Sequence, residues 1–156
     1  MTTRYRALVV EDSNVSMRAV SNLIELQPGV KVVGTAVDAD DGLQLARTLR
    51  PDIVFADLEM PGKSGLELVQ ALSTELPQTW RVVISVHEGD VWRKLSHSHG
   101  AHAFIPKREL AERLPGLLWE FFEVGTSPLS TTTTSLAAES PSLSASPGGP
   151  GKLESC

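Results

Sequence analysis

"PDIVFADLEMPGKSGLEL", residues Pro51 to Leu68, carries the clearest structural signal in this chain. It joins a short apolar run, an acid at the end of that run, a Met-Pro-Gly turn and the start of a helix. A buried run followed by a turn and a helical pattern is typical of a βα unit in a parallel sheet. The open question is whether Asp57 is only a turn residue or a carboxylate that the strand holds at a prepared position.

Outward from this stretch, short β-branched runs alternate with helical patterns in both directions. The predicted strands are Arg6–Val10, Val30–Ala36, Asp52–Ala56, Arg81–Ser85 and Ala103–Ile105. Four of the predicted helices are Ser13–Leu26, Asp38–Arg50, Asp90–His99 and Leu110–Glu123, the last with a restart at Pro115. A further helix is predicted to begin at Ser64, where Glu67, three residues later, completes a capping box. Trp80, Trp92 and Trp119 are placed outside the strands. This alternation predicts an α/β fold, a doubly wound parallel sheet of five βα units in the flavodoxin-like strand order 2-1-3-4-5.

Composition sets the limits of the folded part. The chain has 156 residues, which suits one domain, and a net charge of −5 without a basic block, which argues against a nucleic-acid surface. We predict a folded domain over residues 4–123 and a disordered tail over 124–156, which is rich in Ser, Thr, Pro and Gly. No apolar run suits a signal peptide or a membrane span, and the single cysteine, Cys156, excludes a disulfide framework. The expected location is cytoplasmic.

Polar side chains stand where four of the predicted strands end. The first strand ends in Glu11 and Asp12, the third in Asp57 and the fourth in Ser85, and Lys107 follows the fifth. The carboxyl ends of parallel strands meet at one edge of the sheet, and function gathers there. In the expected strand order these four strands are neighbours, so we expect the five side chains to share one crevice.

This set of side chains points to a particular chemistry. Carboxylates held together repel one another, and a hard cation such as Mg²⁺ relieves the repulsion through oxygen ligands. A lysine ammonium and a hydroxyl on the same rim supply donors for phosphate oxygens. Acids for a metal, an aspartate nucleophile, a hydroxyl and a lysine together predict a phosphoryl-transfer site.

The folded part, from Tyr5 to Phe122, resembles the receiver domain of bacterial two-component response regulators. The segments that carry the resemblance are "VVEDS" (Val9–Ser13), "PDIVFADLEMPGKSGLEL", "VVISV" (Val82–Val86) and "GAHAFIPK" (Gly100–Lys107). Each segment is a weak signal alone, but their order and intervals together are highly specific.

The resemblance implies a role for each acid. Asp57 is then the phosphoacceptor, and the donor is a histidine kinase or a histidine phosphotransfer protein. Asp12 and Asp57 are expected to ligate Mg²⁺ directly, together with the main-chain carbonyl of Glu59. Glu11 is expected to act on the ion largely through water.

The resemblance also implies a switch. Ser85 matches the hydroxyl that moves toward the phosphoryl group, Lys107 matches the lysine that pairs with that group, and Phe104 matches the aromatic ring that turns inward. The expected output surface is formed by Asp90–His99, Ala103–Ile105 and Leu110–Glu123. A downstream protein effector is the expected partner, a homodimer is possible, and direct nucleic-acid or membrane contact is not expected.

The chain departs from the family pattern after the lysine. Many receiver domains have a proline there in a cis bond, whereas Arg108 follows Lys107 here, so we expect an all-trans and more mobile loop. His87, two residues after Ser85, is expected at the mouth of the pocket. With Glu59 it is a candidate modulator of the lifetime of the acyl phosphate.

Other readings stay open on the sequence alone. The chain could be the receiver fragment of a longer DNA-binding response regulator. It could also be an aspartate-nucleophile phosphatase of the haloacid-dehalogenase type, although Glu59 stands where such enzymes place a second aspartate. A flavodoxin-like flavin protein is disfavoured because Glu11 and Asp12 stand where the flavin phosphate would bind. On the first reading the chain is not an enzyme beyond its own phosphorylation and dephosphorylation.

Overall fold

The computed structural model describes residues 5–125. The strands are β1 (Tyr5–Val10), β2 (Val30–Ala36), β3 (Ile53–Asp57), β4 (Trp80–Ser85) and β5 (Ala103–Pro106). The helices are α1 (Asn14–Glu25), α2 (Ala39–Leu49), α3 (Gly65–Glu75), α4 (Asp90–Ser98) and α5 (Leu110–Gly125), with a short 3₁₀ turn η1 (Lys107–Glu109). Residues 126–156, which make up most of the predicted tail, lie outside the described residues.

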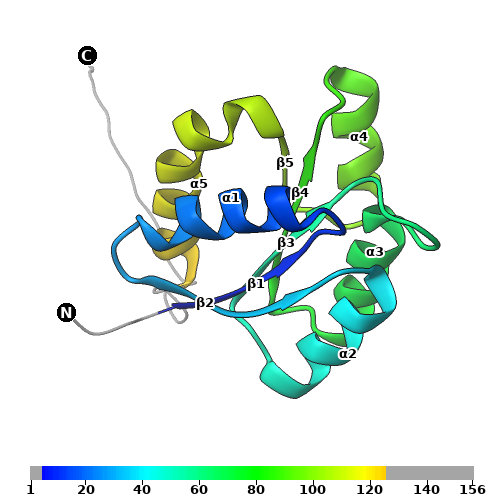
Figure 1. The fold of residues 1–156 in the computed structure, drawn as a ribbon, viewed down its shortest axis with the longest axis horizontal. Coiled ribbons are helices and arrows are strands. Elements are labelled where there is room, and N and C mark those ends of the chain that lie inside the picture. Colours follow the sequence, from blue (N-terminus) through cyan, green and yellow to red (C-terminus); the bar gives the residue numbers. More distant parts are fainter. Residues whose placement is uncertain (1–4, 126–156) are drawn as a thin grey trace, which may run out of the picture. The chain divides into compact units, whose positions relative to one another are not determined.

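The five strands form one parallel sheet in the order β2-β1-β3-β4-β5. This confirms the predicted flavodoxin-like order, in which β3 is central. Figure 1 shows α1 on one side of the sheet and α2 and α3 on the other. A strand that is covered on both faces needs apolar residues at every position rather than at alternate positions. All five residues of β3 are accordingly buried, including its last residue, Asp57.

Local chemistry explains where the first three helices begin. The side chains of Ser13, Asp38 and Ser64 accept hydrogen bonds from the backbone N–H groups of the first turns of α1, α2 and α3. The side chain of Glu67 in turn accepts a hydrogen bond from the backbone N–H of Ser64, so the predicted capping box is confirmed. Each cap stabilises its helix by about 1 kcal/mol and fixes the point at which the chain leaves the edge of the sheet.

Three sequence predictions are wrong in detail. Asp57 is the last residue of β3 rather than the first residue beyond it, because its backbone continues the pairing with Ile84 of β4. Trp80 opens β4, where it pairs with Ile53, although it was placed outside the strands. Helix α5 continues through Pro115 without a restart.

A buried arginine ties the start of β4 to the loop before β5. Arg81 is only 8% exposed, and its guanidinium donates to the carbonyls of Gly100 and Thr79, at 2.7 Å in each case. Its backbone N–H donates to Nδ1 of His102 at 3.0 Å. The ring of His102 stacks on Trp80, with 4.7 Å between the ring centroids. Burial lowers the pKa of Arg81, and its bonds to carbonyls satisfy the donors of the buried group.

Protonation of His102 is expected to destabilise the fold. Its ring remains partly exposed, yet lost hydration and the nearby charges of Arg81 and His97 lower its pKa from 6.5 to about 4. Protonated Nδ1 also cannot accept the Arg81 N–H. Since the folded-state pKa is depressed, the stability is present above pH 6.5 and is lost as pH falls toward 4. Urea unfolding across this range should show a loss in the wild type that His102→Asn, which keeps an acceptor, does not share. Parallel curves for the two proteins would contradict this.

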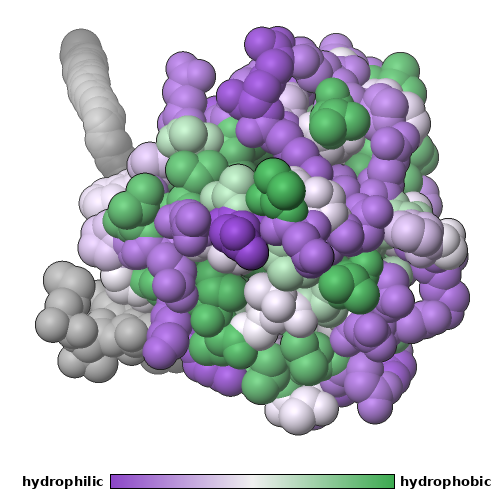
Figure 2. All heavy atoms as spheres, in the orientation of Figure 1, coloured by the Kyte–Doolittle hydropathy of each residue, from purple (hydrophilic) through white to green (hydrophobic). Residues whose placement is uncertain are grey.

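No helix within residues 5–125 is long and apolar enough to cross a membrane. On the face drawn in Figure 2, hydrophobic residues are interspersed with hydrophilic ones. Among the described residues, exposed large hydrophobic side chains include Val15 of α1, Leu26 just after it, and Val86, Val91 and Leu95 in or before α4.

Candidate functional site

A hollow of about 440 Å³ opens at the carboxyl edge of the sheet. Its lining comes from the ends of β1, β3, β4 and β5 and consists of Glu11, Asp12, Ser13, Asp57, Glu59, Met60, Pro61, Val86 and Lys107. Four of the five side chains expected in one crevice line this hollow, namely Glu11, Asp12, Asp57 and Lys107, whereas Ser85 is fully buried and does not line it. Segments nearly one hundred residues apart in the chain meet here.

The three predicted carboxylates come together in this hollow. Glu11, Asp12 and Asp57 each place a carboxylate oxygen within 4.8 Å of the others. Glu11 is 1% exposed and Asp57 is 6% exposed, whereas Asp12 lies at the open side. Burial, and then the charge of Glu11, raise the pKa of Asp57 from 3.8 to about 7. Crowded oxygen donors whose ionisation is opposed in this way fit a hard divalent cation such as Mg²⁺.

Glu11 is held by three donors. Its Oε2 accepts from the backbone N–H of Ser13 at 3.1 Å, and its Oε1 accepts from Oγ of Ser16 at 2.9 Å and from Nζ of Lys107 at 2.6 Å. Burial opposes the ionisation of Glu11, but these hydrogen bonds outweigh it and lower the pKa of the carboxyl. Glu11 is therefore a fixed negative charge beside Asp57.

Lys107 lies between the two buried acids but closer to Glu11. Its Nζ is 2.6 Å from Oε1 of Glu11, 2.9 Å from Oγ of Ser16 and 3.4 Å from Oδ2 of Asp57. Sequence reasoning did not identify Ser16 as a member of the site. The available signal was its position in the first turn of α1, close to the acidic pair Glu11 and Asp12.

Ser85 and Phe104, the predicted switch pair, lie on adjacent strands. Ser85 is fully buried, and its Oγ accepts the backbone N–H of His87 at 2.9 Å. Phe104 pairs with Val83 and is 2% exposed, so its ring is already packed in the core. A coupled movement of these two residues stays a prediction.

The two candidate modulators meet at the mouth of the hollow. Nε2 of His87 lies 2.5 Å from Oε2 of Glu59, and the imidazole stacks on Trp92 with 4.8 Å between the ring centroids. Arg108 forms two hydrogen bonds to the carboxylate of Glu88, one of them at 2.6 Å from Nη2. Residues 5–125 contain no cis peptide bond, so the predicted all-trans loop is confirmed.

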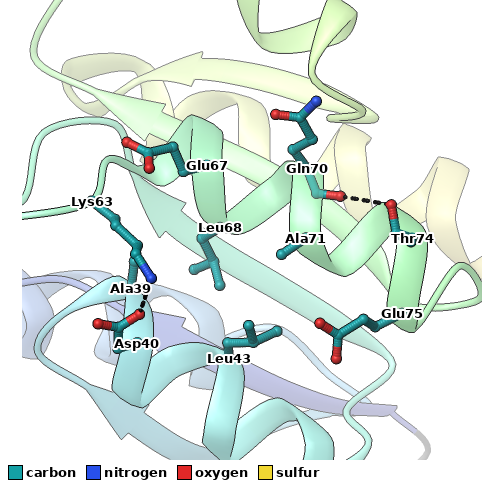
Figure 3. Close-up of a pocket in the computed structure, with 10 residues that line it drawn as sticks. All are labelled: Ala39, Asp40, Leu43, Lys63, Glu67, Leu68, Gln70, Ala71, Thr74 and Glu75. Atoms are coloured by element: carbon teal, nitrogen blue, oxygen red, sulfur yellow. Dashed lines mark hydrogen bonds and ion pairs between the residues drawn. The ribbon is translucent and has the colours of Figure 1, made fainter.

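A second hollow lies between α2 and α3 (Figure 3). Leu43, Leu68 and Ala71 form its apolar floor, and Nζ of Lys63 bonds to Oδ1 of Asp40 at one end, at 2.7 Å. Glu11, Asp12 and Asp57, the three acids that come together at the sheet edge, do not line it. The chemistry predicted from the sequence therefore belongs to the hollow at the sheet edge.

Comparisons with known proteins point the same way. The sequence profile of the response regulator receiver domain matches residues 7–118. A protein-glutamate methylesterase/protein-glutamine glutaminase 2 of Koribacter versatilis is 40% identical over 86 residues, which cover 55% of this chain and 23% of that protein. The response regulator domain of Thermotoga maritima CheB aligns with a TM-score of 0.68 and 29% identity, covering 79% of this chain and 97% of that one.

A second solved structure is the signal receiver domain of the putative response regulator NarL from Mycobacterium tuberculosis. It aligns with a TM-score of 0.71 and 27% identity, covering 79% of this chain and 99% of that one. The curated relatives are longer proteins: the matches span 23% of the Koribacter versatilis protein and 28% of the corresponding one from Nitratidesulfovibrio vulgaris. The similarity to the methylesterases is therefore limited to a minor part of their length.

Proposed function

Because the chain belongs to the family of response regulator receiver domains, we propose that it accepts a phosphoryl group on Asp57 from a histidine kinase or a histidine phosphotransfer protein. The observation that carries this proposal is the set of charged side chains around Asp57. Its buried carboxylate lies 3.4 Å from the ammonium of Lys107 and within 4.8 Å of two further carboxylates. A strand-end aspartate held beside a cation and a group of metal-binding oxygens is the arrangement that phosphoryl transfer needs.

The donor set suits Mg²⁺. Asp12 and Asp57 would hold the ion directly, with the main-chain carbonyl of Glu59 as a further ligand, and Glu11 would act on it largely through water. When bound, the ion would supply positive charge against the phosphoryl oxygens. The protein's own contribution is to hold the carboxylate oxygens of three side chains in one place at the edge of a rigid sheet.

The remaining side chains act on the phosphoryl group and its surroundings. The rigid β3 holds the carboxylate of Asp57 for in-line attack on phosphorus, and the ammonium of Lys107 would neutralise charge on a phosphoryl oxygen. Ser85 would turn its hydroxyl toward the same group, and Phe104 would respond in the adjacent strand. His87 and Glu59, which are in contact at the mouth, would limit the access of water and so lengthen the life of the acyl phosphate.

We further propose that the output is a protein–protein contact. Val91 and Leu95 of α4 are 73% and 37% exposed, and Val86, just before this helix, is 68% exposed. Apolar side chains gathered at one element favour a protein partner. This partner would be a downstream effector or a second copy of the chain, and catalysis would be confined to the chain's own phosphorylation and dephosphorylation.

Incubation of the full chain with acetyl phosphate and Mg²⁺ tests the proposal. Intact-mass measurement should show the addition of one phosphoryl group, and hydroxylamine should remove it because an acyl phosphate is labile to that nucleophile. Reduction with borohydride followed by peptide mapping should place the modification at Asp57. Steady turnover of a phosphate ester without a stable adduct would instead favour the aspartate-nucleophile phosphatase.

A further inference from the structure

Ser16 is a polar residue of α1 whose side chain reaches the centre of the site. Its Oγ donates to Oε1 of Glu11 at 2.9 Å and accepts from Nζ of Lys107 at 2.9 Å. The hydroxyl therefore bridges two charged groups that already contact each other at 2.6 Å. The three side chains form a closed triangle of hydrogen bonds, and Asp57 lies outside it.

This triangle biases the position of the ammonium. Nζ of Lys107 is 3.4 Å from Oδ2 of Asp57 but forms two shorter contacts inside the triangle. Hydrogen bonds that involve an ionised group are roughly twice as strong as those between neutral groups. To pair with a phosphoryl oxygen on Asp57, the ammonium has to move toward Asp57 and weaken its contact with Ser16.

We propose that Ser16 is a positioning residue that holds Lys107 on Glu11 in the resting protein and thereby opposes its transfer to a phosphoryl group on Asp57. This inference rests on the proposed function. It differs from that function in assigning an opposing role: Ser16 stabilises the unphosphorylated arrangement more than the phosphorylated one. Removing the hydroxyl should therefore favour the phosphorylated arrangement.

The same triangle limits the availability of Glu11 to a metal ion. Two of its three donors, Ser16 and Lys107, share the single oxygen Oε1. Without the Ser16 hydroxyl, this oxygen has one donor fewer and is freer to accept a bond from water on a bound Mg²⁺. Mg²⁺ binding by the unphosphorylated chain should strengthen too, which provides a readout that needs no phosphoryl group.

The test compares Ser16→Ala with Ser21→Ala and Ser16→Thr in the full chain. Ser21 is a matched control because it is also a half-buried serine of α1, and its hydroxyl has no hydrogen-bond partner within the described residues. Ser16→Thr keeps the hydroxyl. Titrations with Mg²⁺ alone, and with beryllofluoride in the presence of Mg²⁺, can be followed by tryptophan fluorescence.

We expect Ser16→Ala to bind beryllofluoride about three- to tenfold more tightly than the wild type, the factor for one hydrogen bond to a charged group in a half-exposed site. Mg²⁺ affinity should rise in the same direction, and the acyl phosphate formed from acetyl phosphate should persist longer. Ser21→Ala and Ser16→Thr should match the wild type. If Ser16→Ala changes the affinity and Ser16→Thr does not, the hydroxyl is responsible rather than a general structural effect of substituting this residue.

The failures can be told apart. If the wild type neither gains phosphate at Asp57 nor binds beryllofluoride, the proposed function itself is wrong. If the wild type does both but Ser16→Ala binds beryllofluoride equally or more weakly, the role assigned to Ser16 is wrong. A similar rise in Ser21→Ala would also overturn it, because a general loosening of α1 would then be the cause.

Discussion

Asp57→Asn is expected to abolish the uptake of phosphate from acetyl phosphate completely. An amide oxygen is a far poorer nucleophile than a carboxylate oxygen, and Asp57 is the acid that β3 itself carries. The amide has nearly the shape of the carboxyl group, so the buried position should accept it without a cavity. Intact-mass measurement after incubation with acetyl phosphate and Mg²⁺ gives the result directly.

The same variant should be more stable than the wild type in metal-free buffer at pH 8. The pKa of Asp57 is raised to about 7 from 3.8, first by burial and then by Glu11, so its ionisation is disfavoured in the folded state. The wild type therefore loses stability as pH rises between these two values, whereas asparagine has no proton to lose and stays neutral. We expect a gain of about 1–3 kcal/mol in the free energy of unfolding.

Mg²⁺ should reverse this ranking or reduce the difference. The ion stabilises the protein that binds it more tightly, and that is the protein with all three carboxylates. Urea unfolding of both proteins, with EDTA and then with Mg²⁺, gives the four values needed. An Asn variant that still gains one phosphoryl group would show that the nucleophile lies elsewhere. A less stable Asn variant in EDTA would show that the burial and repulsion of the Asp57 carboxylate do not limit the stability of the metal-free protein.

Gly65→Ala is expected to be the most damaging single methyl substitution near the site. A Cβ at this position would lie 2.2 Å from the carbonyl oxygen of Asp57 and 3.2 Å from Cα of Leu58. Both atoms belong to backbone, so no side chain can rotate away to relieve the overlap. The backbone N–H of Gly65 also donates to the carbonyl of Leu58 at 3.0 Å, which holds the two segments together. Helix α3 or the end of β3 must therefore move.

We expect Gly65→Ala to cost about 3 kcal/mol or more in the free energy of unfolding, as overpacking against fixed atoms does. The remaining folded protein should take up phosphate at least roughly tenfold more slowly, since a displacement of ~1 Å at a reacting group is enough for such a loss. Urea unfolding and the acetyl-phosphate assay measure the two effects separately.

Gly116→Ala provides the control. An added Cβ at Gly116 meets no heavy atom within 4 Å, and the residue is helical. Alanine should therefore leave the stability unchanged or raise it by about 0.5–1 kcal/mol through its better helix propensity. A Gly65→Ala protein as stable as Gly116→Ala would show that α3 shifts freely relative to β3.

Much of the fold could be predicted because its signals are local. The apolar run Ile53–Ala56, the turn at Pro61-Gly62 and the cap at Ser64 each depend on a few neighbouring residues. One prediction failed because long-range pairing overrode composition, and another failed because a helix continued through a proline. Trp80 belongs to β4 only because β3 lies beside it, and Pro115 stays within α5 despite its low helix propensity.

Most of the residues that form the candidate site could be predicted from the sequence. Glu11, Asp12, Asp57 and Lys107 all line one hollow, because parallel strands bring their carboxyl ends to a common edge. Ser16 could not be identified as a member. A serine in the first turn of a helix is commonly a solvated or capping residue, so the position of Ser16 near the acidic pair was too weak a signal.

By itself, the sequence determined the order of strands and helices and the set of charged groups at the strand ends. Both follow from periodicity and turn chemistry within short windows. Only the tertiary structure decided which acid Lys107 contacts. Its bonds to Glu11 and Ser16 span 96 and 91 residues. Its Nζ lies 2.6 Å from Oε1 of Glu11 but 3.4 Å from Oδ2 of Asp57. Differences below 1 Å depend on how the packed strands set the backbone, and such packing is a property of the whole core.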